Sequence, residues 1–266
     1  MQNIGFIGTG NMGTAIIKGV AAKFGAEVSI YATDLDQAKL AALSEYGVTA
    51  CEKNSEVLSH CKYVFLAVKP QGMDAVLADI AGSVTAETVL ISIAAGLDGD
   101  YFKARTDINA KVVLVMPNTP LLLGEGASAL AQVAPTTDEE FAFVKSLFDA
   151  CGVTAVVPEN KMKEIIAVNG SSPAFIYLFA KGFIDYADSV GIDADAAKTL
   201  FCKTLIGSAK MMTDSGYSVD ELIKMVSSPG GTTLAGLGAY YDGNLNDVTA
   251  DACKRCTGRA YELAQA

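Results

Sequence analysis

Two loops in this sequence combine residue types and spacings that suit the binding of negatively charged groups. Residues 5–13 read G-F-I-G-T-G-N-M-G and contain the spacing G-x-G-x-x-G. Residues 227–233 read S-S-P-G-G-T-T and lead into an apolar run from Leu234. Each loop brings glycines to the expected start of a helix, where free backbone N–H groups and the positive end of the helix dipole attract anions.

The first loop predicts a dinucleotide-binding turn, because it lies between a short apolar run and a helical pattern that begins at Thr14. Gly8 would allow the tight turn, and Gly10 would let the backbone approach a pyrophosphate. Gly13 would let the helix pack closely on the strand. The setting of strand, turn and helix makes the spacing informative, since the bare spacing is weak evidence.

The second loop has two interpretations. Its adjacent glycines expose consecutive backbone N–H groups, so the loop could hold a small carboxylate, with the hydroxyls of Thr232 and Thr233 beside it. Alternatively, it is a Pro-Gly turn followed by a threonine N-cap. The residues alone favour the second interpretation.

Asp34 and Lys69 each have two interpretations as well. Asp34 follows the predicted strand 27–31 and could accept hydrogen bonds from an adenosine ribose. It could also be the N-cap or a first-turn carboxylate of a helix predicted over 34–46. Lys69 follows a strand at the edge where open α/β sheets bind ligands, so it could face a cofactor; before Pro70 it could equally be a solvated charge.

Histidine and cysteine usage excludes several kinds of chemistry. The chain has one histidine, His60, which argues against Ser-His-Asp, Cys-His and multi-histidine metal sites. Six scattered cysteines suit reduced thiols in a large core-forming chain. Cys253 and Cys256 form a single C-x-x-C in a helical context, which is more typical of one helix face than of a zinc or redox site, so no metal is predicted.

Bulk composition indicates a globular chain of one or two domains. The 266 residues are 51% apolar and carry a net charge of −10, which argues against nucleic acid as a partner. The most apolar segment, 165–180, is too short and too interrupted for a membrane span. Since the glycine turn begins at the eighth residue, there is no room for a signal peptide, and we expect a cytoplasmic protein.

The pattern of elements predicts two domains, a dinucleotide-binding domain over 1–158 and a helical domain over 159–266. After the strand that enters the glycine turn, the predicted strands are 27–31, 63–66, 88–93, 111–116, 127–133 and 152–157, with a short segment at 48–49 between the first two of these. Helices alternate with them. Beyond Pro158 the sequence predicts only helices, among them 193–215 and short helices from Val219 and near the C-terminus. The fold class is α/β plus all-α, an N-terminal Rossmann-like doubly wound sheet followed by a helical domain.

Five stretches together resemble the pyrroline-5-carboxylate reductase family, and their order and spacing do so over essentially the whole chain. The stretches are residues 5–13, 65–71, 116–120, 170–175 and 227–233. The resemblance implies reduction of 1-pyrroline-5-carboxylate to L-proline by NAD(P)H. It also implies a helical domain that intertwines with a partner's, so that a homodimer or a higher homo-oligomer builds each site from two subunits.

The resemblance also implies which residues touch the ligands. The implied cofactor-binding residues are Gly8, Thr9, Gly10, Asn11, Met12, Gly13, Asp34, Asn54, Ala67, Val68, Lys69, Pro70, Ala94 and Ala95. The implied substrate-binding residues are Ser228, Gly230, Gly231, Thr232 and Thr233. Thr233 is the implied catalytic residue, hydrogen-bonding the ring nitrogen. An imine suits a chain with one histidine, because adding hydride to a protonated C=N bond leaves a neutral amine and no alkoxide.

Two departures from the family pattern stand out. The family commonly carries an arginine where this chain has Leu114 or Val115. Residues 31–34 lack an arginine that would mark a pocket for a 2′-phosphate, so NADH is at least as well supported as NADPH.

Two alternative functions are open. One is an oxidoreductase of the β-hydroxyacid dehydrogenase type, for which Lys161 or Lys163 would be the catalytic lysine, although the glycine-rich pattern that should lead into it is absent. The other is a non-catalytic protein that senses NAD(P), which would have no need to keep the loop 229–233.

Overall fold

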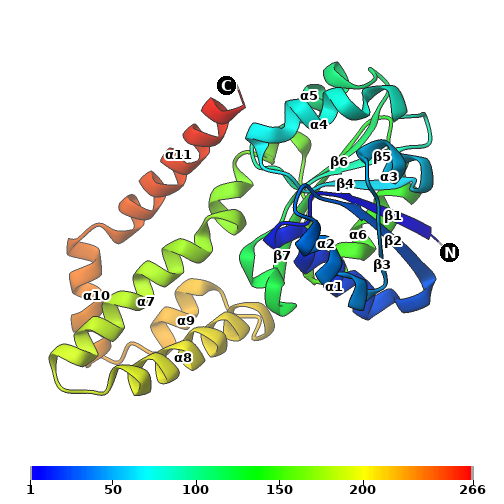
Figure 1. Cartoon of the computed structure of the whole chain (residues 1–266). Coiled ribbons are helices and arrows are strands. Elements are labelled where there is room, and N and C mark those ends of the chain that lie inside the picture. The colour runs from blue at the N-terminus through cyan, green and yellow to red at the C-terminus, as the bar shows by residue number, and fades with distance from the viewer. Residues whose placement is uncertain (1, 265–266) are drawn as a thin grey trace. The chain divides into compact units, whose positions relative to one another are not determined.

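The computed structural model describes residues 2–264, which form two compact units (Figure 1). The sheet unit contains residues 2–173 and 255–264, and the helical unit contains residues 174–254. The predicted boundary at 158/159 marks the end of the sheet. Residues 159–173 nevertheless stay with the sheet unit by their contacts, because the Asn169 amide donates to the carbonyl oxygens of Met116 and Ala127.

The described strands form one sheet. They are β1 (Gln2–Ile7), β2 (Val28–Thr33), β3 (Val48–Ala50), β4 (Tyr63–Leu66), β5 (Val89–Ser92), β6 (Lys111–Met116), β7 (Gly126–Val133) and β8 (Gly152–Val156). Their order is β3-β2-β1-β4-β5-β6-β7-β8. All neighbours pair in parallel except β6 and β7. The predicted doubly wound sheet is confirmed, and its strand order reverses between β1 and β4, where such sheets open a crevice.

Helices cover both faces of this sheet (Figure 1). They are α1 (Asn11–Phe24), α2 (Gln37–Ala42), α3 (Asn54–His60), α4 (Met73–Ile80), α5 (Gly99–Arg105) and α6 (Asp138–Asp149). Side chains alternate along each strand, so Phe6 belongs to a core with α1 and α6, and Ile7 to a second core with α3, α4 and α5. Burial on both faces explains the continuous apolar runs of the central strands.

Three helices differ from the sequence prediction. α2 begins only at Gln37, because the Asp36 carboxylate caps it by accepting from the Ala38 and Lys39 N–H groups. α5 was not predicted, because Phe102 is the only large buried side chain among its seven residues. One such residue does not give the repeating apolar pattern by which a helix is recognised. The C-terminal helix, predicted to be short, is the long helix α11 (Leu245–Leu263).

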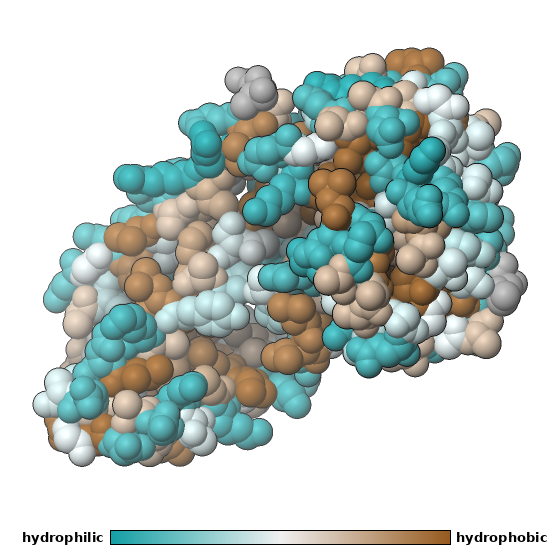
Figure 2. All heavy atoms as spheres, viewed as in Figure 1, coloured by the Kyte–Doolittle hydropathy of each residue, from teal (hydrophilic) through white to brown (hydrophobic). Residues whose placement is uncertain are grey.

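The helical unit is built around α7 (Ser172–Ser189) and α8 (Ala194–Asp214), with α9 (Val219–Met225) and α10 (Thr232–Asp242) beside them. Stacked aromatic rings join its helices, such as Phe183 with Phe201 at 4.2 Å between centroids. Many apolar side chains of this unit are exposed, and Figure 2 shows them as brown patches. None of the helices within residues 2–264 combines the length and apolar character of a membrane span.

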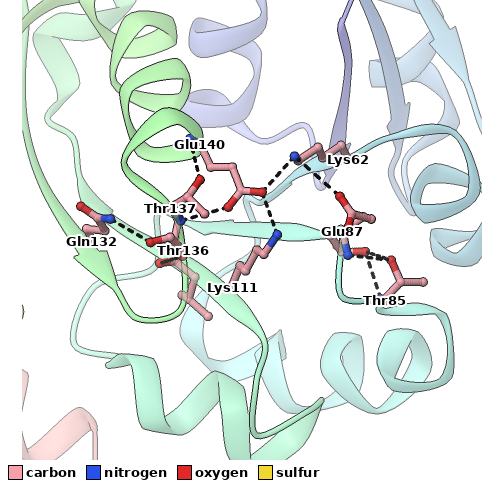
Figure 3. A network of polar contacts seen from close by, with 10 residues as sticks. Lys62, Thr85, Glu87, Lys111, Gln132, Thr136, Thr137 and Glu140 are labelled. Atoms are coloured by element: carbon pink, nitrogen blue, oxygen red, sulfur yellow. Dashed lines mark hydrogen bonds and ion pairs between the residues drawn. The ribbon is translucent and has the colours of Figure 1, made fainter.

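A buried carboxylate, Glu140, joins three elements at the edge of the sheet where β4 and β6 begin (Figure 3). Its Oε1 lies 2.8 Å from the Lys111 ammonium and 2.9 Å from that of Lys62. Its Oε2 accepts from the Thr137 N–H and completes the capping box of α6. Burial alone would raise the pKa of Glu140, but the two lysines and the Thr137 N–H lower it from 4.5 to about 2.

We expect Glu140→Gln to lower the free energy of unfolding at pH 7 by about 3 kcal/mol, because it leaves Lys111 partly buried without a countercharge. Since folding lowers this pKa, the stabilisation is complete above pH 4.5 and is lost as the pH falls toward 2. Urea unfolding at pH 7 and pH 3 measures both effects.

Asp149→Asn is the control for this prediction, because it removes an exposed ion pair with Lys145. We expect it to cost less than about 1 kcal/mol. Equal stability of Glu140→Gln and the wild type at both pH values would contradict the structural role of this network.

Candidate functional site

The turn between β1 and α1 has the geometry that the glycine spacing predicted. Gly8 has φ +94°, and a Cβ there would lie 2.8 Å from the Ala67 carbonyl oxygen. A Cβ at Gly13 would lie 2.8 Å from the Gly8 carbonyl oxygen. The turn therefore packs directly against the backbone that follows β4, which only glycine permits at these two positions.

The turn is open to a ligand at Gly10. No atom lies within 4 Å of the position that a Cβ would take there. Gly10 is also the N-cap of α1, with no side-chain hydrogen bond to cap the helix. No side chain at Gly10 therefore covers the first N–H groups of α1, which belong to Asn11, Met12 and Gly13. A pyrophosphate could approach them closely.

Asp34 is bound to the glycine turn. One carboxylate oxygen accepts from the Thr9 N–H at 2.5 Å and from the Thr9 hydroxyl at 2.8 Å, and the other accepts from the Asp36 N–H at 2.9 Å. Burial raises the pKa of Asp34, but these hydrogen bonds outweigh it and hold the pKa below its ordinary value. The N-cap interpretation of Asp34 is wrong, because Asp36 caps α2.

A cavity of about 430 Å³ opens beside Asp34 at the carboxyl ends of β1 and β2. Gly8, Leu35, Asn54 and Val68 are among the residues that line it. The Asn54 amide donates to a carboxylate oxygen of Asp79 on α4 at 3.0 Å. The structure thus brings the glycine turn together with Asp34, Asn54 and Val68 around one hollow, and these residues fit the adenosine half of a dinucleotide.

The other implied cofactor residues also follow strands at this edge. Ala67 continues β4 and donates its N–H to the Ile7 carbonyl oxygen at 2.9 Å. Lys69 is exposed before the short helix that begins at Pro70, so both interpretations of its charge stay open. Ala94 and Ala95 follow β5 and line a small hollow.

The same hollow touches Leu114, Val115 and Met116 of β6. Leu114 and Val115 are almost completely buried in the two cores of the sheet. No cation therefore stands at either position where the family commonly has arginine.

Two asparagines at this edge were missed by the sequence analysis. The Asn118 side chain accepts from the Ala127 N–H, and Asn169 lies in a π-helix over Ile166–Gly170, a feature common at functional sites. Asn169 donates to Met116 and Ala127, but its buried Oδ1 has no partner among the described residues. Asn118 lies in the stretch 116–120 and Asn169 directly precedes the stretch 170–175. Both stretches carry the family resemblance, and this was the feature of the sequence that could have indicated these two residues.

The second loop belongs to the helical unit. Gly230 has φ +74°, and Gly231 is the N-cap of α10, with no side-chain cap. The predicted threonine N-cap is therefore wrong, since Thr232 and Thr233 are the first two residues of the helix. Within the described part of the chain, neither hydroxyl has a hydrogen-bond partner. Gly231 packs against Ser228, whose carbonyl oxygen accepts from the Gly231 N–H.

The remaining candidate residues are engaged elsewhere. His60 ends α3, before the amino end of β4, and its ring stacks on Tyr31 at 4.9 Å. Lys163 pairs with Asp98 at 2.8 Å, and Lys161 with Glu164 at 3.6 Å. No group of three or more potential metal ligands occurs within residues 2–264.

Comparison with known proteins finds relatives over the full chain. Residues 159–263 match the family described as pyrroline-5-carboxylate reductase dimerisation, and residues 3–96 match one described as NADP oxidoreductase, coenzyme F420-dependent. The chain is 33% identical to a pyrroline-5-carboxylate reductase of Methanosarcina acetivorans, covering 99% of this chain and 98% of that protein. It is 32% identical to the one from Escherichia coli, covering 99% of both.

Solved structures agree with this. A pyrroline-5-carboxylate reductase from Coxiella burnetii superposes with a TM-score of 0.91 at 29% identity, covering 99% of this chain and 98% of that one. The Plasmodium falciparum pyrroline carboxylate reductase, crystallised with NADP bound, gives a TM-score of 0.89 at 27% identity with the same coverage.

We expect Gly10→Ala to weaken ADP-ribose binding by at least about tenfold, because the added methyl group occupies the open side of the turn. Folding should be unaffected, since φ −62° and ψ −176° suit alanine and no atom lies within 4 Å. Isothermal titration calorimetry and thermal unfolding measure the two effects.

Gly82→Ala is the matched control, at a glycine of the sheet unit where a Cβ also meets nothing. It should change neither quantity. Unchanged ADP-ribose affinity of Gly10→Ala would exclude the close backbone approach.

Proposed function

The chain belongs to the pyrroline-5-carboxylate reductase family, and from this premise we propose that it reduces the C=N bond of 1-pyrroline-5-carboxylate to give L-proline, using NAD(P)H. The observation that carries this proposal is the similarity over 99% of the chain, which spans both the glycine turn and the loop before α10. It makes the protein an NAD(P)-dependent oxidoreductase. No observation favours the β-hydroxyacid dehydrogenase or the sensor interpretation.

The cofactor is held by the residues around the glycine turn. The N–H groups at the start of α1 would bind the pyrophosphate, and Asp34 and Asn54 would contact the adenosine half. The nicotinamide half would be held by residues that follow the carboxyl ends of β4 and β5, namely Ala67, Val68, Lys69, Pro70, Ala94 and Ala95. When bound, the reduced nicotinamide supplies the hydride.

The substrate carboxylate is held by the loop before α10. Since α10 has no side-chain cap, the N–H groups of Thr232 and Thr233 lie where an anion is favoured. The Gly231 N–H donates to the Ser228 carbonyl oxygen and so holds the loop in this turn. Ser228 and Gly230 shape the turn that presents them. The Thr233 hydroxyl, which has no partner in the described part of the chain, hydrogen-bonds the ring nitrogen and orients it.

Positioning supplies most of the rate. The ring enters as a protonated imine, its carbon accepts the hydride, and the electron pair of the C=N bond moves to nitrogen, which leaves an amine. No alkoxide forms, so a strong acid is not required. The only histidine, His60, lies before the amino end of β4, opposite to the edge at which the glycine turn lies. The protein contributes by holding the pyrroline ring against the nicotinamide ring.

We further propose a cytoplasmic homodimer formed through the helical domain, with domains divided at 158/159 and each site completed by the partner. Residues 159–263 match a dimerisation family, and α7 carries exposed apolar side chains on several sides. Leu178 is 73% exposed and Tyr177 is 63% exposed. A helix with apolar residues around its circumference is typical of a buried position, which a partner would provide.

The proposed reaction is tested by following the oxidation of NADH and of NADPH separately with 1-pyrroline-5-carboxylate, with proline identified as the product. A panel of 3-hydroxy acids with the oxidised cofactors is the comparison. Efficient oxidation of a 3-hydroxy acid without imine reduction would overturn the proposal, as would tight cofactor binding with no turnover.

We expect Thr233→Ala to lower kcat/KM for 1-pyrroline-5-carboxylate by about 10- to 100-fold, because it removes the hydroxyl that orients the ring nitrogen. Cofactor affinity should stay the same. Thr233→Ser keeps the hydroxyl and should retain most of the activity. If Thr233→Ala keeps the wild-type kcat/KM, the hydroxyl has no role in the reaction.

We expect Leu178→Glu to shift the protein from dimer to monomer in light scattering, because it places a charge in the proposed interface. Circular dichroism would verify that the helices remain. Ile108→Glu, at a residue 75% exposed in the sheet unit, is the matched control and should stay dimeric. A dimer that survives Leu178→Glu would place the interface elsewhere.

A further inference from the structure

The Asp34 carboxylate has one position left for a ligand hydroxyl. An ionised carboxylate offers about four lone-pair positions. Three are taken, two by Thr9 on Oδ2 and one by the Asp36 N–H on Oδ1. Among the described contacts, the position that remains is on Oδ1, which can accept a hydrogen bond from a hydroxyl of a ribose bound there. A 2′-phosphate carries about −1.5 to −2 charges and donates none, so it meets only repulsion there.

No cationic side chain is among the described residues that line the cavity beside this carboxylate. Among the described residues that line the cavity, Asp34 is the only charged one. Leu35, the next residue, is fully exposed, and an arginine at this turn is what would mark a pocket for a 2′-phosphate. Lys39 attracts Asp34 and helps to lower its pKa, but its ammonium is exposed and is paired with Asp36 at 3.5 Å.

The neighbouring amide is directed to another carboxylate. Asn54 also lines the cavity, and its Nδ2 group donates to Asp79 at 3.0 Å. Asp79 is exposed on α4 and adds a second negative charge near the cavity. A phosphate that used the Asn54 amide as a donor would compete with Asp79 for it and would lie close to that carboxylate.

We propose that Asp34, supported by Asp79, makes this protein select NADH over NADPH. The proposal rests on the proposed use of a nicotinamide cofactor and names which of the two forms the site takes. The two hydrogen bonds from Thr9 fix the glycine turn, and together with the one from the Asp36 N–H they fix the carboxylate, so it cannot swing away to admit a phosphate. Recognition of the ribose and exclusion of the 2′-phosphate are thus performed by one side chain.

Calorimetric titration with ADP-ribose and with 2′-phospho-ADP-ribose tests the proposal, because these probes contain the adenosine half and no nicotinamide. We expect the wild type to bind ADP-ribose at least about tenfold more tightly. Asp34→Ser combined with Leu35→Arg should reverse the preference. Asp34→Asn keeps the side-chain volume and should reduce the ratio, because it removes the charge and replaces one acceptor oxygen with an N–H donor.

The ratio of the two affinities is the readout, because a change in the turn alone weakens both probes alike. Asp74→Asn is the control, since it removes a carboxylate on α4 that pairs with Arg105 away from the cavity, and it should leave the ratio unchanged. Equal or tighter binding of 2′-phospho-ADP-ribose by the wild type would overturn the proposal.

The test also separates this proposal from the proposed reaction. Failure of the wild type to bind either probe would overturn the cofactor use and the preference together. A clear preference for ADP-ribose without reduction of 1-pyrroline-5-carboxylate would support the role of Asp34. That result would overturn only the proposed reaction.

Discussion

The Asp34 carboxylate holds the turn between β1 and α1 to the end of β2, and the cofactor site depends on this contact. Thr9 donates twice to it, so the backbone of the turn is fixed, and within residues 2–264 no side chain caps the first N–H groups of α1. The same carboxylate lies in the cavity at the edge of the sheet. Support of the turn and selection of the cofactor therefore follow from one set of hydrogen bonds.

Charge is distributed differently at the two edges of the sheet. At the edge where β4 and β6 begin, Glu140 is neutralised by Lys62 and Lys111 and joins helix α6 to the strands. At the carboxyl edge, Asp34 is stabilised by N–H and O–H donors and keeps its charge for a ligand. One carboxylate stabilises the fold, and the other is available for recognition.

Local sequence patterns predicted most of the fold. Continuous apolar runs located the central strands because both faces of the sheet are covered, and the spacing of Gly8, Gly10 and Gly13 located the turn. α5 was not predicted because it has only one large buried side chain, Phe102, and a helical period can be recognised only from several buried residues. The predicted start of α2 was wrong because Asp34 and Asp36 could both have capped the helix. Asp34 instead binds Thr9, a contact between residues 25 positions apart in the chain that no local pattern shows.

The sequence by itself determined the doubly wound sheet, the glycine turn, the family and the loop before α10, because each is specified by residue types at short spacing. Only the tertiary structure decided that Asp34 binds the turn, that Asn54 faces Asp79, and that Asn169 joins β6 to β7. These contacts join segments far apart in the chain, so no local pattern encodes them. They arise when the strands pair and bring their carboxyl ends to one edge.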